Sequence, residues 1–374
     1  MADVIAATAG AALSAQEQKQ SLARRFFIKG ITIAILSGMC YGLYSAFLTV
    51  GMGRGVWSLW YGGSLASVFM VTYVLGALGS AVNDTISALW SAILAAGQGK
   101  FGDVFRCLKT KPGAVMVLCA LIGGPIASTA YVVALQMAGS MVIPITALCP
   151  AIGAILARVL FKAPLNKRMV VGILICVAAS VMIGSTSFGV GKSPNLLIGC
   201  IIALVAALGW GIEGSVAGYG TTLVDYQIGI TIRQATSGLS NLIILVPLMA
   251  LMAGRVAQAP KLIISAFTSG PAMIFFLISG FFAMFAYSLW YKGNSMCGAP
   301  LGMAANGAFS FWGPFFCWIV LGVVLRQPGW ALAPIAWAAA VVMIIGICLI
   351  AFNPLDFFKK MPVGATCALS EEVN

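Results

Sequence analysis

The sequence predicts an all-α integral membrane protein whose ten transmembrane helices form two inverted repeats of five. Three observations predict this fold class. Of the 374 residues, 61% are hydrophobic and only 8% are charged, whereas soluble globular domains carry about 25% charged residues. The apolar residues gather into ten runs of about 20 residues, the length that crosses a bilayer. Short motifs also recur in the same order in the two halves of the chain.

The ten predicted spans are joined by short connections, and their even number places both termini on one side of the membrane. They cover residues 28–50, 64–95, 113–138, 141–161, 167–187, 195–218, 228–252, 272–292, 297–323 and 331–352. They divide the chain into a tail (1–27), a first repeat (28–190), a second repeat (191–354) and a second tail (355–374).

The second span is unusually long. No Lys or Arg occurs from Ser64 to Gln98, and a straight helix of that length would run about 50 Å, against a hydrocarbon core of about 30 Å. We expect Asn83-Asp84-Thr85 to interrupt this helix.

The net charge of +12 follows the positive-inside rule. With the N-terminus in the cytoplasm, sixteen of the 21 Lys and Arg residues lie on the cytoplasmic side. The five on the outside are Arg54, Lys192, Arg255, Lys261 and Arg326. This bias predicts a multi-pass protein of the cell membrane with both termini cytoplasmic. It also accounts for the basic charge without a nucleic-acid partner.

Several chemistries are excluded by what the sequence lacks. It contains no histidine, the commonest general base and transition-metal ligand, and its ten cysteines are scattered singly. We therefore expect no catalytic residues, no metal site and no cofactor. No G-x-x-x-x-G-K-[ST] phosphate-binding loop occurs either, so any transport would draw its energy from a gradient or from exchange.

Three motif pairs indicate an internal duplication. Tyr41-Gly42-Leu43-Tyr44 corresponds to Trp210-Gly211-Ile212-Glu213, Ala130-Tyr131 to Ala286-Tyr287, and Pro150 with Lys162 twelve residues later to Pro314 with Arg326. Because each half has an odd number of spans, the halves run in opposite directions, as in many secondary transporters. We expect the Gly-x-x-x-Gly motifs at Gly38 and Gly214 to serve packing within a monomer rather than dimerisation.

With these features the chain resembles the drug/metabolite transporter superfamily in its ten-helix, EamA-like form. The resemblance covers about 28–352 and rests on the five-plus-five layout, Leu148-Cys149-Pro150, Gly313-Pro314 and Gly209-Trp210-Gly211. It implies a solute carrier with a central cavity between the halves that works by alternating access in a bacterial inner membrane. The chain departs from the family at Phe161-Lys162 and Leu325-Arg326, where members often carry a Leu-Gly-Glu ending.

Two acids fall within predicted spans, and a retained intramembrane charge is by default a functional candidate. Glu213 is the stronger, because flanking glycines allow a ligand to approach closely and a buried carboxyl can exchange a proton for a cation. Its position in the first helix of a repeat is similar to that of the membrane glutamate of small multidrug resistance proteins. The alternative interpretation is that Glu213 lies near the cytoplasmic end of its helix, where its carboxyl reaches water. Asp84 is weaker, since a helix cap or kink would explain it equally well.

Polar residues also form a stripe on the seventh span. Arg233, Ser237, Ser240 and Asn241 follow one helical face, which predicts either a wet cavity or contacts with other helices. Arg233 would form a salt bridge with Glu213 or Asp84, or hold a substrate carboxylate.

Other candidates line the expected centre. Asn306 and Ser310 precede Gly313-Pro314, where freed backbone carbonyls would line a site. The aromatic residues Trp210, Tyr131, Tyr287 and Trp312 would suit an amine by cation–π attraction, although packing is the favoured explanation for each one taken singly. Tyr44, the repeat counterpart of Glu213, would lie toward the outside as part of a gate.

The leading hypothesis is a secondary active transporter for a small polar or amphiphilic metabolite, with proton coupling through Glu213 as the most economical energy source. Glu213 favours a cation, Arg233 an anion, and the two together a zwitterion. The alternatives are a lipid flippase or a channel and, with less support, a membrane-embedded enzyme. Neither the substrate nor the direction of transport follows from the sequence.

Overall fold

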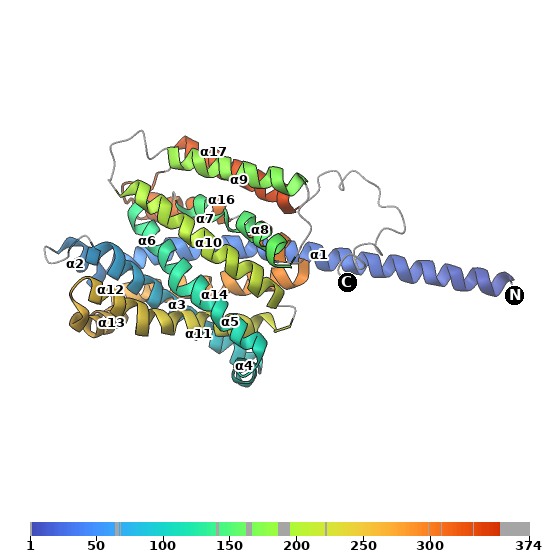
Figure 1. Cartoon of the computed structure of the whole chain (residues 1–374), viewed down its shortest axis with the longest axis horizontal. Helices are drawn as coiled ribbons and strands as arrows, with labels where there is room; N and C mark the ends of the chain where they lie inside the picture. Colours follow the sequence, from blue (N-terminus) through green and yellow to red (C-terminus); the bar gives the residue numbers. More distant parts are fainter. Residues whose placement is uncertain are drawn as a thin grey trace.

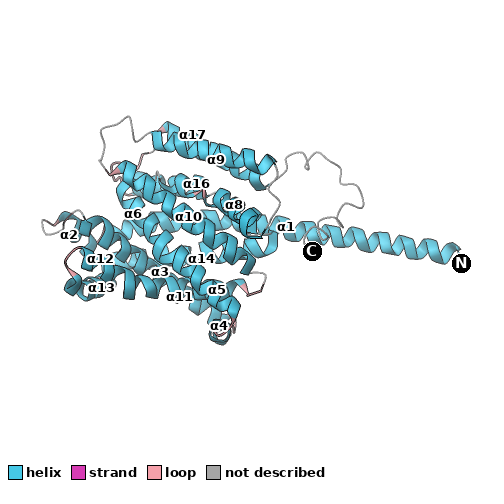
Figure 2. Ribbon diagram, viewed as in Figure 1, coloured by secondary structure: helices cyan, strands magenta, loops and turns pink. Residues whose placement is uncertain are grey.

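The computed structural model describes residues 2–63, 67, 69–139, 142–161, 167–185, 195–220, 223–297, 299–307, 309–331 and 333–351. Within these ranges the protein consists of helices, and no strand occurs (Figure 2). The all-α fold class is thereby confirmed. The second tail (355–374) and the junction of the repeats near Lys192 lie outside the described residues.

The first half of the chain contains the helices up to α9. They are α1 (Ala2–Met52), α2 (Val56–Gly62), η1 (Met70–Val74), α3 (Leu75–Gly97), α4 (Phe101–Leu108), α5 (Lys111–Leu121), η2 (Ile122–Ser128), α6 (Thr129–Ala138), α7 (Val142–Thr146), α8 (Cys149–Phe161) and α9 (Lys167–Ser185). The segments η1 and η2 are π-helical turns that continue into α3 and α6.

The second half contains the helices from α10 onward. They are α10 (Leu196–Gly220), α11 (Tyr226–Ser240), η4 (Asn241–Leu245), α12 (Val246–Met252), η5 (Val256–Gln258), α13 (Ala259–Thr268), α14 (Gly270–Cys297), α15 (Ala299–Asn306), α16 (Phe309–Cys317), η6 (Trp318–Val324) and α17 (Pro334–Ala351). Helices thus occupy all ten segments expected to be spans.

Five helices in the described part are long and apolar enough to cross a membrane, which indicates a membrane protein. They cover Ser21–Met52, Lys111–Ala138, Leu196–Ala217, Tyr226–Met252 and Gly270–Cys297. Shorter apolar helices cover Cys149–Leu160, Val170–Ala179, Trp312–Val324 and Pro334–Leu349.

The helices lie roughly along one another in a single bundle (Figure 1). Helix α1 packs along α14, α3 along α11, and α9 along α17, with the last pair at one edge of the bundle. The N-terminal part of α1 projects away from the bundle (Figure 1). The first tail is therefore helical, which agrees with the high helix propensity of its many alanines.

The expected interruption at Asn83-Asp84-Thr85 is wrong. Helix α3 runs through this triplet as 23 continuous residues, a length of about 34 Å. Asn83 and Asp84 are buried, because the neighbouring helices supply their hydrogen-bond partners. The side-chain oxygen Oδ1 of Asn83 accepts a hydrogen bond from the Ser279 hydroxyl at 2.6 Å.

Candidate functional site

The described residues bury three charged side chains, Asp84, Glu213 and Arg233. Helix α10 positions Glu213 and helix α11 positions Arg233. The Arg233 Nε donates to Glu213 Oε1 at 2.9 Å, and its Nη2 donates to Oε2 at 3.3 Å. Both side chains have 0% exposure. The salt bridge expected between Arg233 and one of the two acids is therefore present, and it is bidentate, the geometry that suits a guanidinium.

The remaining donors of the Arg233 guanidinium are also satisfied. Its Nη2 donates to the Gly123 carbonyl at 3.1 Å and to Ser128 Oγ at 3.2 Å, while Nη1 donates to the Gln234 side chain. The guanidinium carbon lies 3.9 Å from the centre of the Tyr287 ring, a cation–π geometry. Arg233 is thus fully buried and bonded on all sides, which differs from its expected place among the sixteen cations at the cytoplasmic surface.

A π-helical turn supplies part of this site. In η2 the backbone is wider than an α-helix and contains Pro125, which has no N–H to donate. The Gly123 carbonyl accepts hydrogen bonds from Trp210 Nε1 at 3.1 Å and from Ser128 Oγ at 2.8 Å as well as from Arg233. A Cβ at position 123 would overlap the Glu213 carboxylate, so glycine is required for this close approach.

Asp84 lies beside the ion pair but forms no ion pair of its own within the described residues. Its Oδ2 accepts a hydrogen bond from the Ser237 hydroxyl. Glu213, by contrast, is held by Arg233 and also accepts a hydrogen bond from the Tyr291 hydroxyl at 3.1 Å. The cluster therefore contains two carboxyl groups and one guanidinium.

Polar residues on α11 contact a second row of polar residues on α3. This second row was not identified from the sequence. The facing residues, in order along the pair, are Gln227 and Thr231 with Ser91, Gln234 with Ser87, Ser237 with Asp84, and Asn241 with Ser80. The spacing of Ser80, Asp84, Ser87 and Ser91 follows one helical face, so the periodicity of α3 was the available signal. Helix contacts, the alternative to a wet cavity, account for Ser237 and Asn241 of the predicted stripe.

Aromatic rings cover one side of the charged cluster. Tyr41 lies within 4.5–5.7 Å, between ring centres, of Tyr44, Tyr131, Trp210 and Phe309. The Tyr131 hydroxyl is hydrogen-bonded to Ser45 Oγ at 2.7 Å. The space that remains here is about 20 Å³, room for about one water molecule. Little open space therefore remains among these rings, where the family resemblance implies a central cavity.

The expected site residues separate into two groups. Glu213, Arg233, Ser237, Asp84, Tyr287 and Trp210 come together in the charged cluster, and Tyr131 and Tyr44 lie in the aromatic cover. Asn306 lines the small space beside these rings together with Trp210 and Tyr287, and it donates to Ser37 Oγ at 2.6 Å. Asn241 lies farther along the contact with α3, where it donates to Ser80 Oγ at 3.4 Å, and Trp312 stacks on Phe316. Ser310 lies in α16, but its side chain is outside the described part.

Residues that the sequence did not single out complete the cluster. Gly123, Ser128, Gln234 and Tyr291 all bond directly to Arg233 or Glu213. Gly123 and Ser128 come from a run that reads only as an apolar span, so no periodicity signalled them. Gln234 was discernible as a polar neighbour of Arg233.

Comparisons with known proteins identify a fold but no family. No protein-family model matches the chain, and no curated protein matches it. A solved crystal structure, described only as that of a protein, aligns with a TM-score of 0.50 and 18% identity, covering 86% of this chain and 95% of that chain. This likeness concerns the fold alone.

Proposed function

We propose that this protein is a secondary active transporter for a small polar metabolite, a ten-span carrier of the drug/metabolite transporter, EamA-like kind. The observation that carries the proposal is the buried charged cluster, because it joins elements from both halves of the chain. Asp84 in α3 and the Gly123 carbonyl in η2 come from the first half, whereas Glu213, Arg233 and Tyr287 come from the second. Ionisable groups retained inside an apolar bundle are costly and mark ion or substrate pathways.

Helix contacts support the inverted-repeat arrangement. Helix α1, which opens the first repeat, packs on α14, α15 and α16, the third and fourth spans of the second. Helix α10, which opens the second repeat, packs on α5, α6 and α8, the third and fourth spans of the first. Such an exchange is expected when two equivalent halves face each other across a pseudo-two-fold axis in the membrane plane.

The charge balance of the cluster favours a cationic coupling species. With both carboxyl groups ionised, the cluster would carry one unbalanced negative charge in an apolar interior, which is energetically costly. A proton on Asp84 or a bound cation restores the balance. The groups that face Asp84 from neighbouring helices are Arg233, Glu213, Tyr44 and Tyr287.

This geometry moves the proposed coupling role from Glu213 to Asp84. Glu213 is already neutralised by Arg233 and bonded by Tyr291, so a proton there would break the salt bridge. Asp84 has a single hydroxyl donor in Ser237, which it can keep after protonation. Opening the central space would then expose Asp84 and the aromatic rings to a zwitterionic or cationic solute.

The proposal is tested by solute-induced thermal stabilisation of the purified protein, because a ligand that binds the folded state raises its unfolding temperature. Wild type, Asp84→Asn and Glu213→Gln are compared at pH 5.5 and 8 over amines, amino acids, nucleosides and sugars. We expect one solute class to stabilise the wild type in a pH-dependent way and Asp84→Asn to lose that dependence.

Two other results would be decisive. If only Glu213→Gln lost the pH dependence of the stabilisation, Glu213 rather than Asp84 would be the proton-coupling residue. If no water-soluble class bound, and proteoliposomes moved labelled lipid between leaflets, the flippase alternative would replace the transporter.

A further inference from the structure

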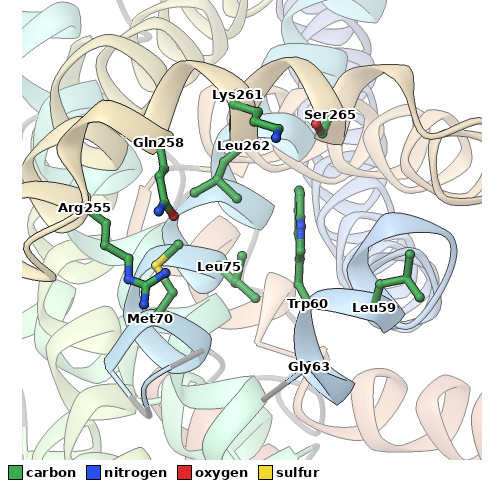
Figure 3. Close-up of a pocket in the computed structure, with 10 residues that line it drawn as sticks. All are labelled: Leu59, Trp60, Gly63, Met70, Leu75, Arg255, Gln258, Lys261, Leu262 and Ser265. Carbon is green, nitrogen blue, oxygen red and sulfur yellow. The ribbon is translucent and has the colours of Figure 1, made fainter. Parts of the chain in front are cut away.

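A second pocket is lined by residues of α2 and α13, which lie side by side at one end of the bundle (Figure 1). Its volume is about 470 Å³, within the range of small-molecule sites. Three parts of the chain line it (Figure 3): Leu59 and Trp60 of α2, Met70 and Leu75 of η1 and α3, and the segment from Arg255 through Gln258 and Lys261 to Leu262 and Ser265.

Part of this pocket is lined by apolar side chains whose positions are fixed by packing against buried neighbours. Met70, Leu75 and Leu262 are nearly fully buried. Trp60 packs edge-on against Trp57, with ring centres 5.2 Å apart, and Trp57 is itself fully buried against Phe276. The Val56 N–H donates to Ser269 Oγ at 3.1 Å, which fixes the start of α2 to the segment preceding α14. An apolar chain placed here would meet a preformed surface.

The pocket is also lined by positive charge that is not paired with an acid of the described residues. Arg255 and Lys261 both line the pocket, with the neutral polar groups of Gln258 and Ser265 near them (Figure 3). No acidic residue lines it, and neither cation forms an ion pair with an acid in the described ranges. This contrasts with Lys100 and Arg106, which both pair with a carboxylate.

We propose that this pocket binds an amphiphile with an anionic headgroup. A phosphate or carboxylate would lie between Arg255 and Lys261, which supply charge-assisted hydrogen bonds, and the attached chain would lie along Trp60, Met70 and Leu75. The same chemistry is offered by a membrane phospholipid and by a free alkyl phosphate. The inference is independent of the transport proposal, since it involves none of the residues in the charged cluster.

The test measures binding to the full-length protein in a neutral detergent. The probes are dodecyl phosphate, inorganic phosphate, phosphatidylglycerol and phosphatidylcholine, with affinity read by titration. Dodecyl phosphate should bind, inorganic phosphate should bind at least about tenfold more weakly because it lacks the chain, and phosphatidylcholine should bind more weakly than phosphatidylglycerol. A higher affinity for dodecyl phosphate than for phosphatidylglycerol would indicate a soluble ligand, and the reverse order would indicate a membrane lipid.

Variants assign the binding to this pocket. Arg255→Gln with Lys261→Gln should weaken dodecyl phosphate binding about tenfold, because both charge-assisted contacts are lost. The matched control is Lys109→Gln with Lys111→Gln, which removes the same charge from exposed positions near α4 and should leave the affinity unchanged. Trp60→Ala should weaken dodecyl phosphate while leaving inorganic phosphate binding unaltered.

Equal binding of inorganic and dodecyl phosphate, or an equal loss in both double variants, would overturn the proposal. Equal binding of the two phospholipids would overturn the anionic preference. Since both double variants keep Asp84, Glu213 and Arg233, loss of this site would leave the solute-induced stabilisation intact, and the two proposals can fail separately.

Discussion

The charged cluster and the pocket lined by α2 and α13 both contain arginine, yet the two arginines are compensated in different ways. Arg233 is fully buried, and each of its three guanidinium nitrogens has a hydrogen-bond partner. Arg255 borders about 470 Å³ of space and has no ion-pair partner among the described acids. A buried charge must be compensated by the protein itself, whereas a charge near water can remain unpaired until a ligand binds.

The difference shows where each region can change. The cluster holds α3, α10, α11, η2 and α14 together, so the proposed function requires these helices to separate before a solute can reach it. The pocket is already open and needs no such movement. Mutations in the cluster should therefore affect stability and conformational equilibrium together, while mutations in the pocket should affect binding alone.

The largest effect is expected for Arg233→Leu. This change leaves Glu213 buried without its counter-charge, and breaking one side of a buried pair costs about 3–5 kcal/mol. We expect a large drop in the thermal unfolding temperature in detergent. Adding Glu213→Gln should restore much of the loss, because the buried charge of Glu213 is then removed together with that of Arg233. A double variant as unstable as the single one would show that packing, rather than charge balance, dominates this region.

Gly123→Ala should have the next largest effect. The added methyl group would overlap the Glu213 carboxylate, and overpacking a tight interior typically costs about 1–3 kcal/mol. The control is Gly102→Ala in α4, where a Cβ meets nothing within 4 Å and alanine favours the helix. Equal unfolding temperatures for the two variants would contradict the close approach of η2 to α10.

Asp84→Asn should change the pH dependence of stability more than stability itself. A carboxyl that is protonated in the folded state stabilises the fold at low pH and loses that contribution as the pH rises. We expect the unfolding temperature of the wild type to fall between pH 5.5 and 8, and that of Asp84→Asn to fall less. The Ser237 hydrogen bond can persist to the amide oxygen. Parallel pH curves for the two proteins would argue against an uncompensated carboxyl at position 84.

Lys100→Gln should have the smallest effect. Its salt bridge to Asp225 spans 2.8 Å, but both side chains are about one-third exposed, and such pairs contribute about 0–1 kcal/mol. We expect an unfolding temperature close to that of the wild type in the same assay. A drop in unfolding temperature as large as that of Arg233→Leu would mean that burial does not determine how much each ion pair contributes to stability.

Periodicity predicted the helices well and the partners of their polar residues poorly. The salt bridge between Glu213 and Arg233 was one of two expected pairings, because each residue stood out as a charge within an apolar run. The role of Asp84 was underestimated, since Asn83-Asp84-Thr85 resembles a helix end when α3 is considered alone. Its partner Ser237 lies 153 residues away, and no local pattern links the two.

The sequence by itself determined the all-α class, the positions of the helical segments and the small set of charges that had to be explained, because hydrophobic runs and their breaks are local properties of the chain. Only the tertiary structure decided that Arg233 is fully buried and bonded on all sides, that little open space remains among the aromatic rings, and that Arg255 and Lys261 share an open pocket with Trp60. The physical reason is that burial, charge compensation and free volume depend on which helices pack together, and residues far apart in the chain determine that packing.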